Sequence, residues 1–161
     1  PVLRGTASYA DELEWLAQSV WSADLDRFVE RSSHDLVILC PYLFGTTVWG
    51  AHAAGDRAAV LPCLHDEPYA RLTTVRRMIE AARGCIFNTP AEERLARRLY
   101  RLRGAGVVGM GFDPVPDAPP TGFASAHGLD RYLVYAGRLE EGKRVDVAVE
   151  YALRHARERA D

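Results

Sequence analysis

The sequence predicts an α/β fold, a Rossmann-like parallel sheet with flanking helices. Short apolar runs that lack an alternating pattern recur along the chain, as is typical of strands buried on both faces. Amphipathic helical stretches separate these runs. A strong helix-start signal, the Thr-Pro-Ala-Glu motif at residues 89–92, directly follows one of them. Such alternation favours parallel strands, right-handed crossovers and helices on both faces of the sheet.

The first predicted element is a helix, and the sheet begins after it. Ser8 and Asp11 have the spacing of a capping box, in which a side chain at each position bonds the backbone of the other. Residues 35–40 are a continuous apolar run and are expected to form the first strand. Residues 58–64 are expected to form the second, with a short helix over about residues 46–54 between the two strands.

The middle of the chain repeats the strand and helix pattern. A helix is indicated by an apolar stripe at helical spacing, formed by Leu72, Val75, Ile79 and Ala82. Gly84 is expected to end this helix in the left-handed conformation. Residues 85–88 then predict a third strand, the motif at residues 89–92 starts the next helix, and residues 106–109 predict a fourth strand.

The composition changes after this fourth strand, which indicates a domain boundary. Residues 114–128 contain four prolines among small and polar residues and predict a linker. Residues 1–113 are therefore assigned to one domain and residues 129–161 to the start of another. The second is expected to open with a fifth strand over residues 132–136, followed by an amphipathic helix.

The overall composition excludes several classes of protein. The chain has 161 residues, 48% of them hydrophobic, and a net charge of −2, which disfavours a dedicated nucleic-acid binder. No apolar stretch approaches the roughly 18–20 residues needed to span a bilayer. The cysteines, Cys40, Cys63 and Cys85, fall at or inside predicted strands. Three buried thiols fit the reducing cytoplasm better than a disulfide framework.

The turn that begins at Gly137 carries the clearest chemical signal. A glycine turn between a strand and a helix presents backbone N–H groups to a phosphate, and here it also carries Arg138 and Lys143. One interpretation is that these two cations hold a diphosphate. A second is the G-x-x-x-x-G-K motif of a P-loop nucleotide hydrolase, which Arg144 disfavours because that motif continues with Ser or Thr. A third is a plain turn with solvated charges.

Four segments in order resemble glycosyltransferase family 4, the group 1 retaining glycosyltransferases. Residues 135–146, Y-A-G-R-L-E-E-G-K-R-V-D, resemble the donor-site turn of that family, usually G-R-L-x-x-x-K-G. Residues 61–66 resemble its strand ending in an active-site histidine, and residues 85–89 its strand leading into a capped helix. Residues 109–113 resemble the turn before its second domain. The similarity runs from about residue 35 to residue 161.

This resemblance implies a two-domain GT-B architecture with two Rossmann-like domains. It implies transfer of a sugar from a nucleotide-sugar donor to a hydroxyl acceptor on a glycan, a lipid or a small molecule, with no cofactor and no metal. Gly137, Arg138 and Lys143 match the positions that bind the donor diphosphate, and His65 matches the one beside the transferred sugar. Arg144 and Met110 depart from the family pattern, where glycine and asparagine are usual.

The resemblance also implies that the chain is part of a larger enzyme. Residues 1–113 would be the later part of the N-terminal acceptor-side domain, and residues 129–161 the first strand and helix of the donor domain. The family's glycine-rich loop and its pair of donor-site glutamates are not recognisable. The chain alone is therefore expected to be inactive and open to self-association through uncovered apolar surface.

Other interpretations remain open at this stage. His65 with Asp66 and Glu67 could bind a metal, which the lack of further ligands disfavours. The arginine-rich helix over residues 90–103 could contact an anionic membrane at its inner face, or simply carry solvated charges over a leucine stripe. The main alternative to an enzyme is a non-catalytic Rossmann-like module that binds a nucleotide or a protein.

Overall fold

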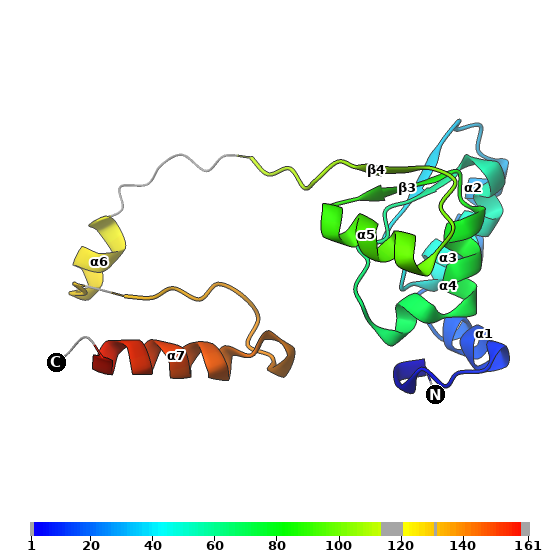
Figure 1. Ribbon diagram of the computed structural model, residues 1–161. Helices are drawn as coiled ribbons and strands as arrows, with labels where there is room; N and C mark the ends of the chain where they lie inside the picture. Colours follow the sequence, from blue (N-terminus) through cyan, green and yellow to red (C-terminus); the bar gives the residue numbers. More distant parts are fainter. Residues whose placement is uncertain (1, 114–120, 131, 159–161) are drawn as a thin grey trace. The chain divides into compact units, whose positions relative to one another are not determined.

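The computed structural model describes residues 2–113, 121–130 and 132–158 (Figure 1). The chain divides into two compact units, Pro1–Gly111 and Phe112–Asp161, called unit 1 and unit 2 below. Unit 1 contains the sheet and most of the buried apolar side chains.

Unit 1 is built on a four-stranded sheet in which all strands are parallel, in the order β1-β2-β3-β4. The strands are β1 (Val37–Leu39), β2 (Ala58–Val60), β3 (Gly84–Phe87) and β4 (Ala105–Val107). Leu39, Val60 and Cys85 lie side by side across the first three strands, and all three are buried. The predicted α/β class and the parallel sheet are confirmed, and each strand lies within or beside the range expected for it.

Five α-helices and three short 3-10 helices complete unit 1. The α-helices are α1 (Tyr9–Ala17), α2 (Ala23–Arg31), α3 (Gly45–Ala54), α4 (Thr73–Ala81) and α5 (Pro90–Leu99). The 3-10 helices are η1 (Val2–Arg4), η2 (Gly55–Arg57) and η3 (Pro68–Arg71). Helix α3 packs against β1 and β2, while α5 packs against β3 and β4. Helix α2 packs on α3, and α1 packs on α4.

The connecting helices share one face of the sheet. Each crossover advances by one strand in the same direction, so crossovers of the usual right hand place α3, α4 and α5 together, as Figure 1 shows. Side chains alternate across a strand, and Ile38 points away from its buried neighbour Leu39 with 55% of its surface exposed. Val108, which follows β4, is 77% exposed. The expectation of helices on both faces is therefore not met by these connecting helices.

Side chains cap the starts of α1 and α4. Ser8 and Asp11 form the full reciprocal box at the start of α1. The start of α4 is capped from a distance, because buried Glu12 on α1 accepts hydrogen bonds from the N–H groups of Thr73 and Thr74 at 2.9 and 2.8 Å. A carboxylate there is favoured by the partial positive charge of the helix N-terminus.

Two helix ends differ from the sequence prediction. Gly84 does not end α4 in the left-handed conformation. The helix ends at Ala81, and Arg83 donates its backbone N–H to the carbonyl of Ala58, which draws Gly84 directly into β3. Helix α5 stops at Leu99, because the next residue, Tyr100, is extended with its ring buried. The basic helix predicted to residue 103 is therefore shorter.

Unit 2 contains α6 (Thr121–His127), the 3-10 helix η4 (Glu141–Lys143) and α7 (Val145–Glu158). The fifth strand predicted over residues 132–136 is not formed. Leu133 and Val134 are 74% and 75% exposed, and the described part of unit 2 contains no strand with which they could pair. The predicted linker falls partly on residues 114–120, outside the described residues, and partly on α6. The assignment of the units to domains of a larger enzyme stays a prediction.

Candidate active site

His65 lies in the segment that follows β2, at the carboxyl-terminal edge of the sheet. Ligands of parallel α/β sheets bind at this edge, so the sequence prediction places the residue at a suitable position. The His65 side chain is exposed and makes no hydrogen bond or ion pair with other described residues. Its imidazole is therefore free to engage a ligand.

The backbone beside His65 is held by Glu92 of α5. One carboxylate oxygen of Glu92 accepts a hydrogen bond from the N–H of Leu64 at 2.7 Å, and the other accepts from the N–H of Asn88 at 2.8 Å. Thr89 caps the same helix by accepting from the N–H of Glu92 at 3.1 Å. Glu92 is only 8% exposed, so these donors satisfy its carboxylate inside the protein. The segment after β2 is thus tied to the start of α5.

The residues after His65 are held by other contacts. The buried Tyr42, which follows β1, donates its hydroxyl hydrogen bond to Glu67, and burial together with this carboxylate raises the pKa of Tyr42. Asp66 forms an ion pair with Arg71 at 2.6 Å. Within the described residues, no group of three or more His, Cys, Asp or Glu side chains is arranged to hold a metal ion. Asp66 and Glu67 therefore serve local contacts here.

Two cysteines meet at the same edge of the sheet. The Sγ atoms of Cys40, after β1, and Cys63, after β2, are 3.9 Å apart. Cys63 has a positive φ of 53°, which is uncommon for a residue other than glycine. Partial burial of the Cys40 thiol and its contact with Cys63 raise the pKa of Cys40, although the residue as a whole is exposed.

The predicted diphosphate-binding residues lie on one turn of unit 2. Arg138 is exposed, with its side chain 3.2 Å from Glu140 in an ion pair, and Lys143 ends η4. A Cβ on Gly137 would lie 2.7 Å from the hydroxyl oxygen of Tyr135, so glycine allows the ring to approach. The hydroxyl of Tyr135 donates to the carbonyl of Arg138 at 3.0 Å and closes the turn.

The backbone of this turn differs from what a P-loop needs. A P-loop directs its N–H groups toward the bound phosphates. Here the N–H groups of Lys143 and Arg144 donate instead to the carbonyls of Glu140 and Glu141, at 3.0 Å in each case. Arg144 itself is left-handed, with φ of 48°, and pairs with Asp146. The turn can bind an anion through its exposed side chains more readily than through its backbone.

The roles predicted for His65, Gly137, Arg138 and Lys143 stay predictions. Arg138 and Lys143 share one turn of unit 2, whereas His65 belongs to unit 1. From the sequence, Glu92 was predicted only as part of the helix-start motif at residues 89–92. The hydrogen bond that it accepts from the N–H of Leu64 was not predicted. A signal was present, because Glu92 lies three and four residues before the buried Leu95 and Ala96, on the apolar face of α5.

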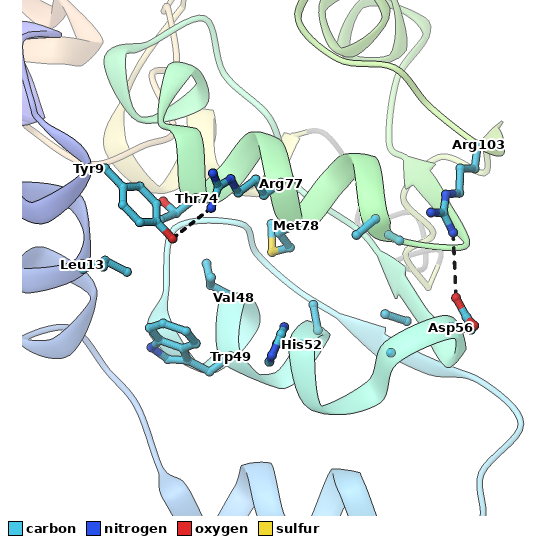
Figure 2. Close-up of a pocket in the computed structure, with 15 residues that line it drawn as sticks. Tyr9, Leu13, Val48, Trp49, His52, Asp56, Thr74, Arg77, Met78 and Arg103 are labelled. Atoms are coloured by element: carbon cyan, nitrogen blue, oxygen red, sulfur yellow. Dashed lines mark hydrogen bonds and ion pairs between the residues drawn. The ribbon is translucent and has the colours of Figure 1, made fainter.

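A cavity of about 400 Å³ lies away from this edge, among α1, α3 and α4 (Figure 2). Figure 2 shows Tyr9 and Arg77 facing one another at one end, where the guanidinium donates to the Tyr9 hydroxyl at 3.2 Å. Arg103 and Asp56 form a 3.8 Å ion pair at the other end. The lining includes Thr74, a buried residue whose hydroxyl has no hydrogen-bond partner among the described residues. His65 does not line this cavity.

The remaining surface predictions are tested only in part. In α5, Leu95 and Ala96 are buried while Arg97 is exposed and pairs with Glu93, as expected for a helix with a core-facing apolar stripe. Among the helices of the described residues, none is long and apolar enough to cross a membrane. Contact of this helix with a membrane surface stays a prediction.

Comparison of the chain with protein-family models, with curated proteins and with solved structures yields no match.

Proposed function

We propose that the chain contributes to a retaining glycosyltransferase of the GT-B architecture. In this proposal, unit 1 belongs to the acceptor-side domain and unit 2 to the donor-side domain. The reaction transfers a sugar from a nucleotide sugar to a hydroxyl acceptor. The observation that carries the proposal is that two cations, Arg138 and Lys143, lie on one exposed turn before α7. In the same chain, His65 lies at the carboxyl-terminal edge of the sheet.

The chemistry of these side chains supports the proposed roles. A guanidinium binds two phosphate oxygens at once, and an ammonium adds a second positive charge. Together they would stabilise the negative charge that develops on a departing nucleoside diphosphate. Arg138 can be released from Glu140 at little cost, because exposed ion pairs contribute only about 0–1 kcal/mol. His65 would donate or accept a hydrogen bond at a sugar hydroxyl.

The P-loop hydrolase receives less support than a diphosphate clamp. The N–H groups of Lys143 and Arg144 are bonded within the turn, and Arg144 supplies no hydroxyl for a magnesium ion. A non-catalytic Rossmann-like module remains the competing function. Such a module would bind at the same sheet edge, with equal affinity for a sugar nucleotide and for the free nucleotide. Comparing these two affinities therefore separates the module from the enzyme.

The first experiment titrates UDP and GDP into the chain and into the Arg138→Ala variant by calorimetry. A hydrogen bond to a charged group contributes about 1.5–3 kcal/mol, so the variant should bind about 10–100-fold more weakly. Arg154→Ala is the matched control, since Arg154 is an exposed arginine of α7 paired with Glu150 at 3.6 Å. Equal binding by wild type and Arg138→Ala, or no binding of either nucleotide by wild type, would refute the donor site.

The second experiment separates an enzyme from a nucleotide-binding module. His65→Ala should weaken binding of UDP-glucose or GDP-mannose, whichever the wild type prefers, and leave binding of the free nucleotide unchanged. His34→Ala serves as control, because His34 is also exposed but precedes β1. If both histidine variants bind the sugar nucleotide like wild type, the role of His65 is wrong and the module is favoured.

A further inference from the structure

Cys40 and Cys63 are positioned for chemistry that the proposed function does not use. They follow β1 and β2, which are neighbours in the sheet, and their sulfurs are 3.9 Å apart. Both are free thiols, one exposed and the other partly exposed. A disulfide has an S–S distance of about 2.0 Å, so the sulfurs would have to approach by roughly 1.9 Å. The approach would come from rotation of the two cysteine side chains about their Cα–Cβ bonds.

The position of the Cys63 sulfur is set by its surroundings. The residue has a φ of 53°, a left-handed conformation that non-glycine residues adopt only when nearby structure holds them there. The side-chain amide of Asn88, after β3, donates a hydrogen bond to Cys63 Sγ at 3.5 Å. This contact helps to hold the Cys63 sulfur in place. Proximity, backbone conformation and this contact are three separate observations on the same pair.

We propose that Cys40 and Cys63 form a reversible intramolecular disulfide when the protein meets hydrogen peroxide. In the first step the thiolate of exposed Cys40 attacks a peroxide oxygen, the O–O bond breaks, and Cys40 sulfenic acid and water form after proton transfer. In the second step the sulfur of Cys63 attacks the sulfenic sulfur, an S–S bond forms, and a second water leaves. Two thiols are oxidised and one peroxide is reduced. A dithiol reductant reverses the change.

Cys85 does not take part in this reaction. It is 4% exposed, so a peroxide does not reach its sulfur, and burial followed by the nearby Glu92 raises the pKa of Cys85 to about 11. The exposure that a sensor thiol requires is not met at this position. Cys85 should therefore stay reduced while Cys40 and Cys63 are oxidised, which makes it a control within the same chain.

The disulfide would connect the carboxyl ends of β1 and β2. Only Leu64 separates Cys63 from His65, and Tyr42 binds Glu67 on the other side of the same histidine. Oxidation would therefore act on the backbone segment that presents His65. The inference itself does not depend on the proposed function, because its readout is the state of the thiols in the absence of any nucleotide.

The test oxidises the reduced full chain with hydrogen peroxide and counts thiols under denaturing conditions. The three thiols should fall to one, the intact mass should decrease by two hydrogen atoms, and a peptide digest should contain Cys40 linked to Cys63. Treatment with dithiothreitol should restore three thiols. Disulfide-linked dimers, oxygen addition without a crosslink, or an unchanged thiol count would each overturn the proposal.

The variant Cys63→Ser tests the sulfenic acid intermediate, which can be detected even where no crosslink forms. In Cys63→Ser the sulfenic acid on Cys40 has no resolving thiol and should be trapped by dimedone, whereas wild type should give little adduct at that residue. Cys85→Ala, the control, should crosslink like wild type. Equal trapping at Cys40 in wild type and Cys63→Ser would show that Cys63 does not resolve it. The digest of wild type decides the question if either variant fails to fold.

Discussion

Replacing Glu92 tests whether a buried carboxylate organises the candidate active site. Its two oxygens accept from the N–H groups of Leu64 and Asn88 at 2.7 and 2.8 Å, and the residue is 8% exposed. Glu92→Ala removes both acceptors and leaves two backbone donors without partners in a region that water reaches poorly. The variant should therefore destabilise unit 1 and loosen the segment that carries His65.

The magnitude follows from the two bonds. A hydrogen bond to a charged group contributes about 1.5–3 kcal/mol, so the loss of two such bonds in Glu92→Ala should lower the free energy of unfolding by about 3–6 kcal/mol. Because a domain is stable by only about 5–15 kcal/mol, this loss is large. Glu92→Gln keeps one acceptor but turns an NH₂ group toward a donor. Its expected loss is about 1–3 kcal/mol.

Urea denaturation followed by tryptophan fluorescence measures this loss. All the tryptophans, Trp15, Trp21 and Trp49, belong to unit 1, so the signal reports that unit alone. The slope of free energy against urea should stay the same, because the surface exposed on unfolding does not change. The midpoint should move to lower urea in the order wild type, Glu92→Gln, Glu92→Ala.

Glu93 offers a matched control on the same helix. It is the next residue, and its carboxylate pairs with Arg97 at 2.7 Å near solvent. Pairs four residues apart on a helix contribute about 0.3–0.5 kcal/mol, so Glu93→Ala should cost little. If Glu92→Ala and Glu93→Ala are equally stable, the buried carboxylate does not hold the segment after β2 and the reasoning fails.

Three further variants test other buried or paired groups. Thr74→Val removes a buried hydroxyl that no described residue bonds, and it should raise the free energy of unfolding by about 1 kcal/mol; a lower urea midpoint would contradict this. Tyr100→Phe leaves the carbonyl of Ala70 without its donor and should cost about 1–2 kcal/mol in the same assay, and an unchanged midpoint would count against it. The hydroxyl and backbone N–H of Ser8 hold the pKa of Asp11 below its usual 3.8, so its contribution to stability is present above pH 3.8 and is lost as pH falls through the lowered value. In Ser8→Ala an NMR titration should find the pKa of Asp11 moved up toward 3.8.

The sequence predicted the sheet because apolar runs and caps are local signals. Residues 35–40 and 58–64 needed no knowledge of their partners to be recognised as buried strands. The prediction of a fifth strand was wrong because strand pairing is not a local property. Leu133 and Val134 have no partner strand in the described part of unit 2. Apolar content alone does not make a strand.

The candidate site could be predicted only as a set of separate residues. His65 and Arg138 each follow from a motif, but the contacts around them connect distant positions. The bond from Leu64 to Glu92 spans 28 residues, and the thiol contact of Cys40 with Cys63 spans 23. The positive φ of Cys63 has no signal in the sequence, because the surroundings and not the residue type hold it.

These contacts give the candidate residues of the two units, His65 in unit 1 and Arg138 in unit 2, different physical character. Leu64 before His65 is fixed by Glu92, and Glu67 after it is fixed by Tyr42, so folding itself orders the backbone that presents the imidazole. A ligand meeting His65 loses little affinity to ordering that segment. Arg138 instead lies on an exposed turn, held by one carbonyl contact and one surface ion pair. Binding of a diphosphate there must order the Arg138 side chain, which costs affinity. A substitution that stabilises this turn before binding should therefore raise the affinity for a diphosphate more than any substitution near His65.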